Sequence, residues 1–168
     1  MRIGKIVEKG ENLSMSSVNM DEKVTLVNLA PWEVAFNKLE SVGHVIIPPK
    51  GKVRVTTRSE VMAQVSNNNN LIGGIDELGS HATVYIDDAE TRKMLEFDTD
   101  SKKQMILTKE VVAKIFELKT FSTFKKRIEE YVVTRCEKRN LMDYIKELGI
   151  NEYDKIVFCQ EHCKFDFL

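Results

Sequence analysis

The spacing of apolar residues changes near residue 100. Before this point apolar residues form short runs interrupted by Gly, Pro and Asn, and after it they recur every three or four residues with no Pro and a single Gly, Gly149. Interrupted runs are typical of strands, and a spacing of three to four residues is typical of helices. We therefore expect an α+β protein. It should have a small β-rich module, a sheet or a barrel, at residues 1–100 and a bundle of three to four short helices at residues 101–168, meeting at the polar stretch Asp98–Lys103.

The N-terminal module contains several short strand candidates. They are Ile3–Glu8, Val24–Leu29, Trp32–Leu39, His44–Ile47, Lys52–Thr56 and Ala82–Ile86. Alternation places Trp32, Val34 and Phe36 on one face of their strand. We expect Trp32 and Phe36 to be buried together with Val84 and Ile86. The Gly-rich stretch Leu71–Ser80 predicts a mobile loop.

Capping residues mark the expected helix boundaries. Thr57 to Glu60 has the spacing of a capping box, and Asp87 or Asp88 can begin a further turn of helix. In the C-terminal module the expected caps are Thr108, Thr120 or Ser122, Thr134 with Glu137, and Asn151. Gly149 is the expected stop of the third of these helices. Tyr153, Ile156, Cys159 and Cys163 should share one face of the last helix.

Bulk composition limits the class of protein. At 168 residues with 42% hydrophobic and 30% charged residues, the chain can bury an ordinary core. It has no run of about 18 apolar residues, and Met1–Lys9 lacks the features of a secretory signal. We therefore expect synthesis in the cytoplasm and no membrane span. Three cysteines fit a reducing compartment better than a disulfide framework.

Two clusters of residues suggest chemistry at first sight. Cys159, His162 and Cys163 could bind zinc with Cys136, but the two closely spaced cysteines lie on the apolar stripe of a helix. Buried structural cysteines explain them better. Ser80 and His81 are adjacent on an extended segment, so their side chains point to opposite faces and cannot pair.

The glycines Gly73, Gly74 and Gly79 lack the Gly-Lys-Ser/Thr ending of a phosphate loop. Because the sequence shows no other grouping of residues typical of a catalytic site, we expect no enzymatic activity, no metal and no cofactor.

Charge divides between the two modules. Residues 1–100 hold 11 basic and 15 acidic residues, and residues 101–168 hold 14 and 11. Opposite charge favours docking of the modules or head-to-tail association of copies, although a solvated helix surface explains the same pattern. The candidate interaction residues are Lys125, Lys126, Arg127, Arg135, Lys138 and Arg139. They could also meet nucleic-acid phosphates, but acidic residues are interleaved with them and the whole chain is not basic.

Several stretches of the chain resemble small uncharacterised proteins of phages and prophages of Gram-positive bacteria. They are Val27–Trp32, Val45–Pro49 with Lys52–Arg54, Gly79–Asp87 and Phe116–Thr120, and the similarity spans roughly residues 24–165. The resemblance implies a phage or mobile-element origin and assigns no functional residues.

Together these features favour a non-enzymatic protein that acts through contacts with itself or with other phage proteins, as a head, neck or tail component of the virion. Two alternatives stay open. One is an accessory protein that binds nucleic acid through the basic helical part, and the other is an inhibitor of a host defence enzyme.

Overall fold

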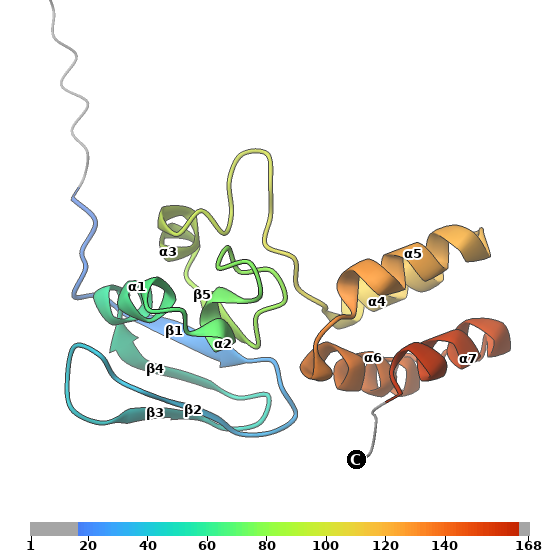
Figure 1. The fold of residues 1–168 in the computed structure, drawn as a ribbon, viewed down its shortest axis with the longest axis horizontal. Helices are drawn as coiled ribbons and strands as arrows, with labels where there is room; N and C mark the ends of the chain where they lie inside the picture. The colour runs from blue at the N-terminus through green and yellow to red at the C-terminus, as the bar shows by residue number, and fades with distance from the viewer. Residues whose placement is uncertain (1–16, 165–168) are drawn as a thin grey trace, which may run out of the picture.

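The computed structural model describes residues 17–164 and has an α+β fold (Figure 1). A β-rich part comes first, and four helices follow at the C-terminal end. The strand expected at Ile3–Glu8 lies outside the described residues.

The strands are β1 (Lys23–Asn28), β2 (Val34–Asn37), β3 (His44–Ile47), β4 (Lys52–Thr57) and β5 (Val84–Asp87). They form a three-stranded antiparallel sheet in the order β4-β1-β5 and a separate two-stranded ribbon, β2-β3, without closing into a barrel. The middle strand, β1, buries Val24, Leu26 and Asn28 in alternation. Alternate burial of this kind is what the pleat of a strand imposes on a sheet with one covered face.

The side chain of Asn28 holds the end of β1 against the ribbon. Its Nδ2 donates to the carbonyl oxygens of Trp32 (2.7 Å), Ile47 (3.2 Å) and Pro48 (3.0 Å), and its Oδ1 accepts from the Ala30 amide (2.9 Å). A buried amide needs such partners, because leaving it unpaired costs about 1–3 kcal/mol. The turn that contains Trp32 is therefore fixed by Asn28, and β2 begins only at Val34.

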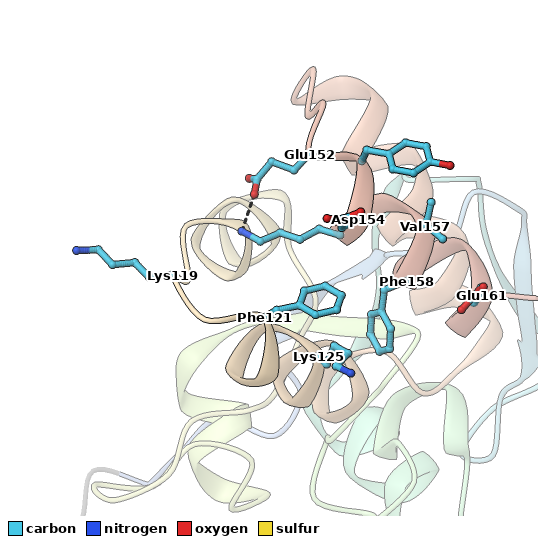
Figure 2. Close-up of a pocket in the computed structure, with 10 residues that line it drawn as sticks. Lys119, Phe121, Lys125, Glu152, Asp154, Val157, Phe158 and Glu161 are labelled. Carbon is cyan, nitrogen blue, oxygen red and sulfur yellow. Dashed lines mark ion pairs between the residues drawn. The ribbon is translucent and has the colours of Figure 1, made fainter.

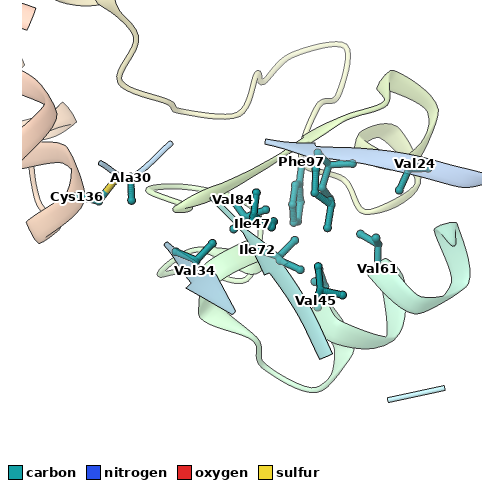
Figure 3. Close-up of a cluster of buried hydrophobic side chains, with 13 residues drawn as sticks. Val24, Ala30, Val34, Val45, Ile47, Val61, Ile72, Val84, Phe97 and Cys136 are labelled. Carbon is teal, nitrogen blue, oxygen red and sulfur yellow. The ribbon is translucent and has the colours of Figure 1, made fainter. Parts of the chain in front are cut away.

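The expected burial of Trp32 is wrong for this reason. Its side chain is 37% exposed, whereas Val84 and Ile86 are fully buried and Phe36 is partly buried against the same core. Alternation places a side chain on the inner face only while the strand continues, and at Trp32 the chain is still in the turn. The core of the β-rich part instead centres on residues such as Leu26, Ile47, Ile72 and Phe97, all fully buried (Figure 3).

The helices are α1 (Arg58–Ser66), α2 (Asn70–Gly73), α3 (Ala89–Met94), α4 (Lys109–Phe116), α5 (Phe121–Tyr131), α6 (Arg135–Glu147) and α7 (Tyr153–His162). The caps expected at Thr57, Asp88, Thr108 and Thr134 are all present, each side chain accepting from a backbone amide of the first turn. Thr120 is the N-cap of α5, but its hydroxyl donates to Thr123 Oγ1 instead. The last helix is capped at Glu152, one residue after the expected Asn151.

Glu60 does not complete the capping box that its spacing predicts. Its amide bonds Thr57, but its carboxylate accepts from the backbone amides of Leu39 (2.7 Å) and Glu40 (2.8 Å) in the loop after β2. Burial alone would raise the pKa of Glu60, but these bonds and one from Gln64 outweigh it and hold the pKa below its usual value. Glu60 therefore ties α1 to the β2-β3 ribbon as a carboxylate.

The stretch Leu71–Ser80, expected as a mobile loop, is closed by hydrogen bonds between its own residues. It begins inside α2, and it closes through Ile75 N to Ser80 O (2.9 Å) and Gly79 N to Gly73 O (2.8 Å). The carboxylate of Asp76 accepts from two further amides of the loop. The glycines of this stretch predicted a loop, but not the hydrogen bonds that close it.

A second core lies among the four C-terminal helices. Its fully buried members include Val112, Phe124, Ile128, Leu141 and Cys159. Cys159 and Cys163 both lie in this core, as their place on a helix stripe predicts. Cys136, on α6, packs instead into the first core beside Ala30 (Figure 3).

Helix α6 bridges the two cores. Asn140 Nδ2 donates to the Leu29 carbonyl (2.9 Å), Lys50 Nζ donates to Asn140 Oδ1 (2.6 Å), and His81 Nδ1 lies 2.7 Å from Glu137 Oε1. The chain between the cores also stays bonded to the first part, through His81 N to Met105 O. The division at residues 100 and 101 therefore stays a prediction, because the structure has two cores with one helix shared between them.

None of the helices in residues 17–164 is long and apolar enough to cross a membrane.

Phe97 and Trp32 test the position of the first core. Phe97→Ala should lower the free energy of unfolding by about 3–5 kcal/mol, because it leaves a cavity in a fully buried site. Trp32→Ala should cost no more than about 1 kcal/mol, because it removes a half-exposed ring and one cation–π contact. Chemical denaturation followed by circular dichroism measures both values, and equal losses would contradict this assignment of the core.

The three thiols should react slowly in the folded protein. Burial raises the pKa of Cys159 to about 12 and the pKa values of Cys136 and Cys163 to about 11, so little thiolate exists at neutral pH. Labelling with a disulfide reagent at pH 8 should be slower than for a free thiol by about 100-fold or more. All three should react at once in denaturant. Fast labelling of the native protein, or one bound zinc by elemental analysis, would contradict this.

Candidate functional site

The six basic residues singled out from the sequence lie on α5 and α6 and face different surroundings. On α5, Lys125 is half-buried, Lys126 is exposed, and Arg127 bonds Glu130 through Nη1 and Oε2 at 2.9 Å. Arg127 is therefore engaged along its own helix, a surface pair of the kind worth about 0.3–0.5 kcal/mol.

The three basic residues on α6 have different surroundings. The Arg135 guanidinium lies 5.6 Å from the centroid of the Trp32 ring, and Arg139 Nε lies 3.4 Å from Asp143 on the next turn. Lys138 is half-buried. The two groups of basic residues, one on α5 and one on α6, thus have different neighbours, and their role in interaction stays a prediction.

Lys125 lines a groove that the sequence did not predict. Its Nζ lies 5.1 Å from the ring centroid of Phe121 and 5.8 Å from that of Phe158. The two rings meet edge to face with centroids 6.1 Å apart, one from α5 and one from α7, and Figure 2 shows them turned toward each other. Around them lies an open groove of about 720 Å³. Its lining residues are Lys119, Phe121, Lys125, Glu152, Tyr153, Asp154, Lys155, Val157, Phe158 and Glu161.

The floor of the groove continues the aromatic packing of the second core. Phe124 is fully buried and contacts three other rings: Phe116 at 5.0 Å, Phe121 at 6.0 Å and Phe158 at 6.2 Å between centroids. Edge-to-face and offset arrangements at these distances are favourable beyond the area they bury. The exposed ring of Phe121 is therefore held on a rigid base.

Two polar side chains fix α7 in place beside this floor. Lys155 Nζ donates to the carbonyls of Phe116 (2.6 Å) and Leu118 (3.2 Å), where α4 ends, and lies 2.7 Å from Glu152 Oε2. A cation suits this position, because the last carbonyls of a helix lack partners within it and carry partial negative charge. At the other end of α7, His162 Nε2 lies 2.6 Å from the Val132 carbonyl after α5.

The two walls of the groove carry opposite charge. Lys119, on the loop before α5, and Lys125, on α5, form the wall on one side, which we call the lysine wall. Asp154 and Glu161, both exposed on α7, lie on the other side, which we call the acidic wall. Glu152, beside them, is engaged with Lys155. The groove therefore has an apolar floor, positive charge on the α5 side and negative charge on the α7 side.

Tyr153 departs most from expectation. Its spacing predicted a place on the buried stripe of the last helix, but its side chain is 77% exposed at the rim of the groove. Helix α7 begins at Tyr153, and this first residue lies outside the core that Ile156, Cys159 and Cys163 contact. The place of Tyr153 in the first turn of the expected helix is the one local signal that could have indicated this exposure.

His81 also has a partner that the sequence did not indicate. Its ring contacts Glu137 on α6 and lines a hollow of about 470 Å³ together with residues such as Asn69, Thr83 and Thr134. The described lining of this hollow includes neither a serine side chain nor a cysteine. Over residues 17–164, no three His, Cys, Asp or Glu side chains are grouped closely enough to hold a metal ion.

Comparison of the chain with protein-family models, with curated proteins and with solved structures finds no match.

Proposed function

We propose that the protein is a non-enzymatic interaction protein and that the groove between α5 and α7 is its protein-binding surface. The observation that carries this proposal is the exposure of Phe121 (43%) and Tyr153 (77%) in a groove with a rigid aromatic floor, between the lysine wall and the acidic wall. Aromatic residues in a preformed depression with a charged rim are the usual composition of a binding hot spot. The resemblance to small phage and prophage proteins favours a head, neck or tail component as the setting for such contacts.

Nucleic-acid binding is the alternative that the same groove brings to mind. Exposed aromatic rings beside lysines are a platform on which single-stranded bases stack. Two observations oppose it. Asp154 and Glu161 would face the phosphates at close range, and Arg135, Lys138 and Arg139 of α6 are not among the residues that line the groove. A protein partner can offer acidic groups to the lysine wall and basic groups to the acidic wall, whereas a phosphate backbone can pair only with the lysine wall.

The proposal predicts that protein contacts in the cell pass through the groove. With a lysine-reactive crosslinker, Lys119 and Lys125 should be joined to a second polypeptide in fixed proportion when the chain is expressed in its own host. Tyr153→Ala should lower the yield of that product several-fold, because it removes exposed aromatic area without touching the core. Val42→Ser is the matched control, because Val42 is fully exposed on the loop between β2 and β3, and it should leave the yield unchanged.

Two outcomes would contradict the proposal. One is an absence of groove crosslinks to any polypeptide. The other is tight binding of a labelled oligonucleotide by the purified chain, with the logarithm of affinity falling linearly with the logarithm of salt concentration, which would favour the nucleic-acid alternative.

A further inference from the structure

The groove is self-complementary in charge. A two-fold axis that runs along a groove places the left wall of one copy against the right wall of the other. In this protein that operation sets Lys119 and Lys125 of one copy opposite Asp154 and Glu161 of the second, twice over. An axis across the groove would set like charges together, so the charge pattern also selects the direction of the axis.

The apolar residues of the groove fit the same arrangement. Phe121 and Phe158 line the groove, and the exposed ring of Phe121 would face the apolar side chains of the second copy near the axis. Tyr153 stands on the same helix as the acidic wall and would therefore lie opposite the lysine wall, where an ammonium group over its ring adds a cation–π contact. In an isologous contact the two copies are equivalent, so the contact between Tyr153 and the lysine wall forms twice.

From this complementarity we infer that the groove is the interface of a homodimer, in which a second copy of this chain occupies it about a two-fold axis parallel to the groove. The inference rests on the proposed function and names the partner of the same surface. It differs from the head-to-tail association that the net charges of the two modules suggest, because an isologous contact closes at two copies whereas a head-to-tail contact continues into rings or filaments.

The inference assigns different roles to the neighbouring basic residues of α5. Lys125 lines the groove and belongs to the interface, whereas Lys126 and Arg127 lie on the same helix and do not line it. Reversal of Lys126 alone should therefore leave association unchanged, which separates this inference from one based on basic charge in general.

Charge reversal of one wall at a time tests the interface. The purified full chain should sediment as a dimer, with twice the mass of the 19.3 kDa chain, and its association should weaken as salt screens the walls. The double variant Lys119→Glu/Lys125→Glu and the double variant Asp154→Lys/Glu161→Lys should each raise the dimer dissociation constant by about tenfold or more, because like charges then face each other twice. The exposed pair Lys52→Glu/Lys93→Glu is the control for net charge and should have no effect.

Mixing the two wall variants gives the decisive result. In a mixed dimer both pairs of walls are again of opposite charge, so the two variants should form a heterodimer more tightly than either variant dimerises by itself. Circular dichroism of each variant checks that the fold is retained, and Tyr153→Ala, which leaves the charges intact, should weaken the parent dimer independently.

A monomeric parent chain, or a mixture that fails to pair, would overturn the inference. A monomer that still shows groove crosslinks to a different polypeptide would leave the proposed function standing and refute the homodimer alone. A dimer that is indifferent to both wall variants and to Tyr153→Ala would refute the groove as its interface.

Discussion

The docking of helix α6 against the β-rich part is the constraint on which the rest of the structure depends. Asn140 is 2% exposed, and its amide bonds the Leu29 carbonyl on one side and the Lys50 ammonium on the other. One turn earlier, Cys136 enters the first core. The other face of the same helix sends Leu141 and Ile145 into the second core. Because a buried amide is costly to leave unpaired, only one placement of α6 satisfies both its polar and its apolar contacts.

This placement determines where the groove lies. Helix α7 packs against α5 and α6, and Lys155 and His162 fix its two ends to the carbonyls that follow α4 and α5. Phe158 is thereby brought to Phe121, and Tyr153, the first residue of α7, stays exposed. The groove is thus a consequence of how a small helical core is closed.

The elements whose signals are local could be predicted from the sequence. Thr108 and Thr134 mark helix starts because a cap acts within four residues, and Gly149 marks a stop because it adopts the left-handed conformation that ends α6. Trp32 and Glu60 could not be placed in this way. The turn around Trp32 is held by Asn28, whose amide also bonds the carbonyls of Ile47 and Pro48 about 20 residues away. The Glu60 carboxylate accepts from the amides of Leu39 and Glu40, which are equally distant in sequence. The groove has the same origin, because no local pattern indicates that Phe121 and Phe158 meet.

Native-state hydrogen exchange tests the central claim, that α6 couples the two cores into one cooperative unit. Slowly exchanging amides of β1 and β5 and those of α4 and α5 should open with the same free energy, and Asn140→Ala should lower both by a similar amount, about 1–3 kcal/mol, because it removes the shared anchor. Helical amides that open at a lower free energy and do not respond to Asn140→Ala would show two independent cores and contradict the account.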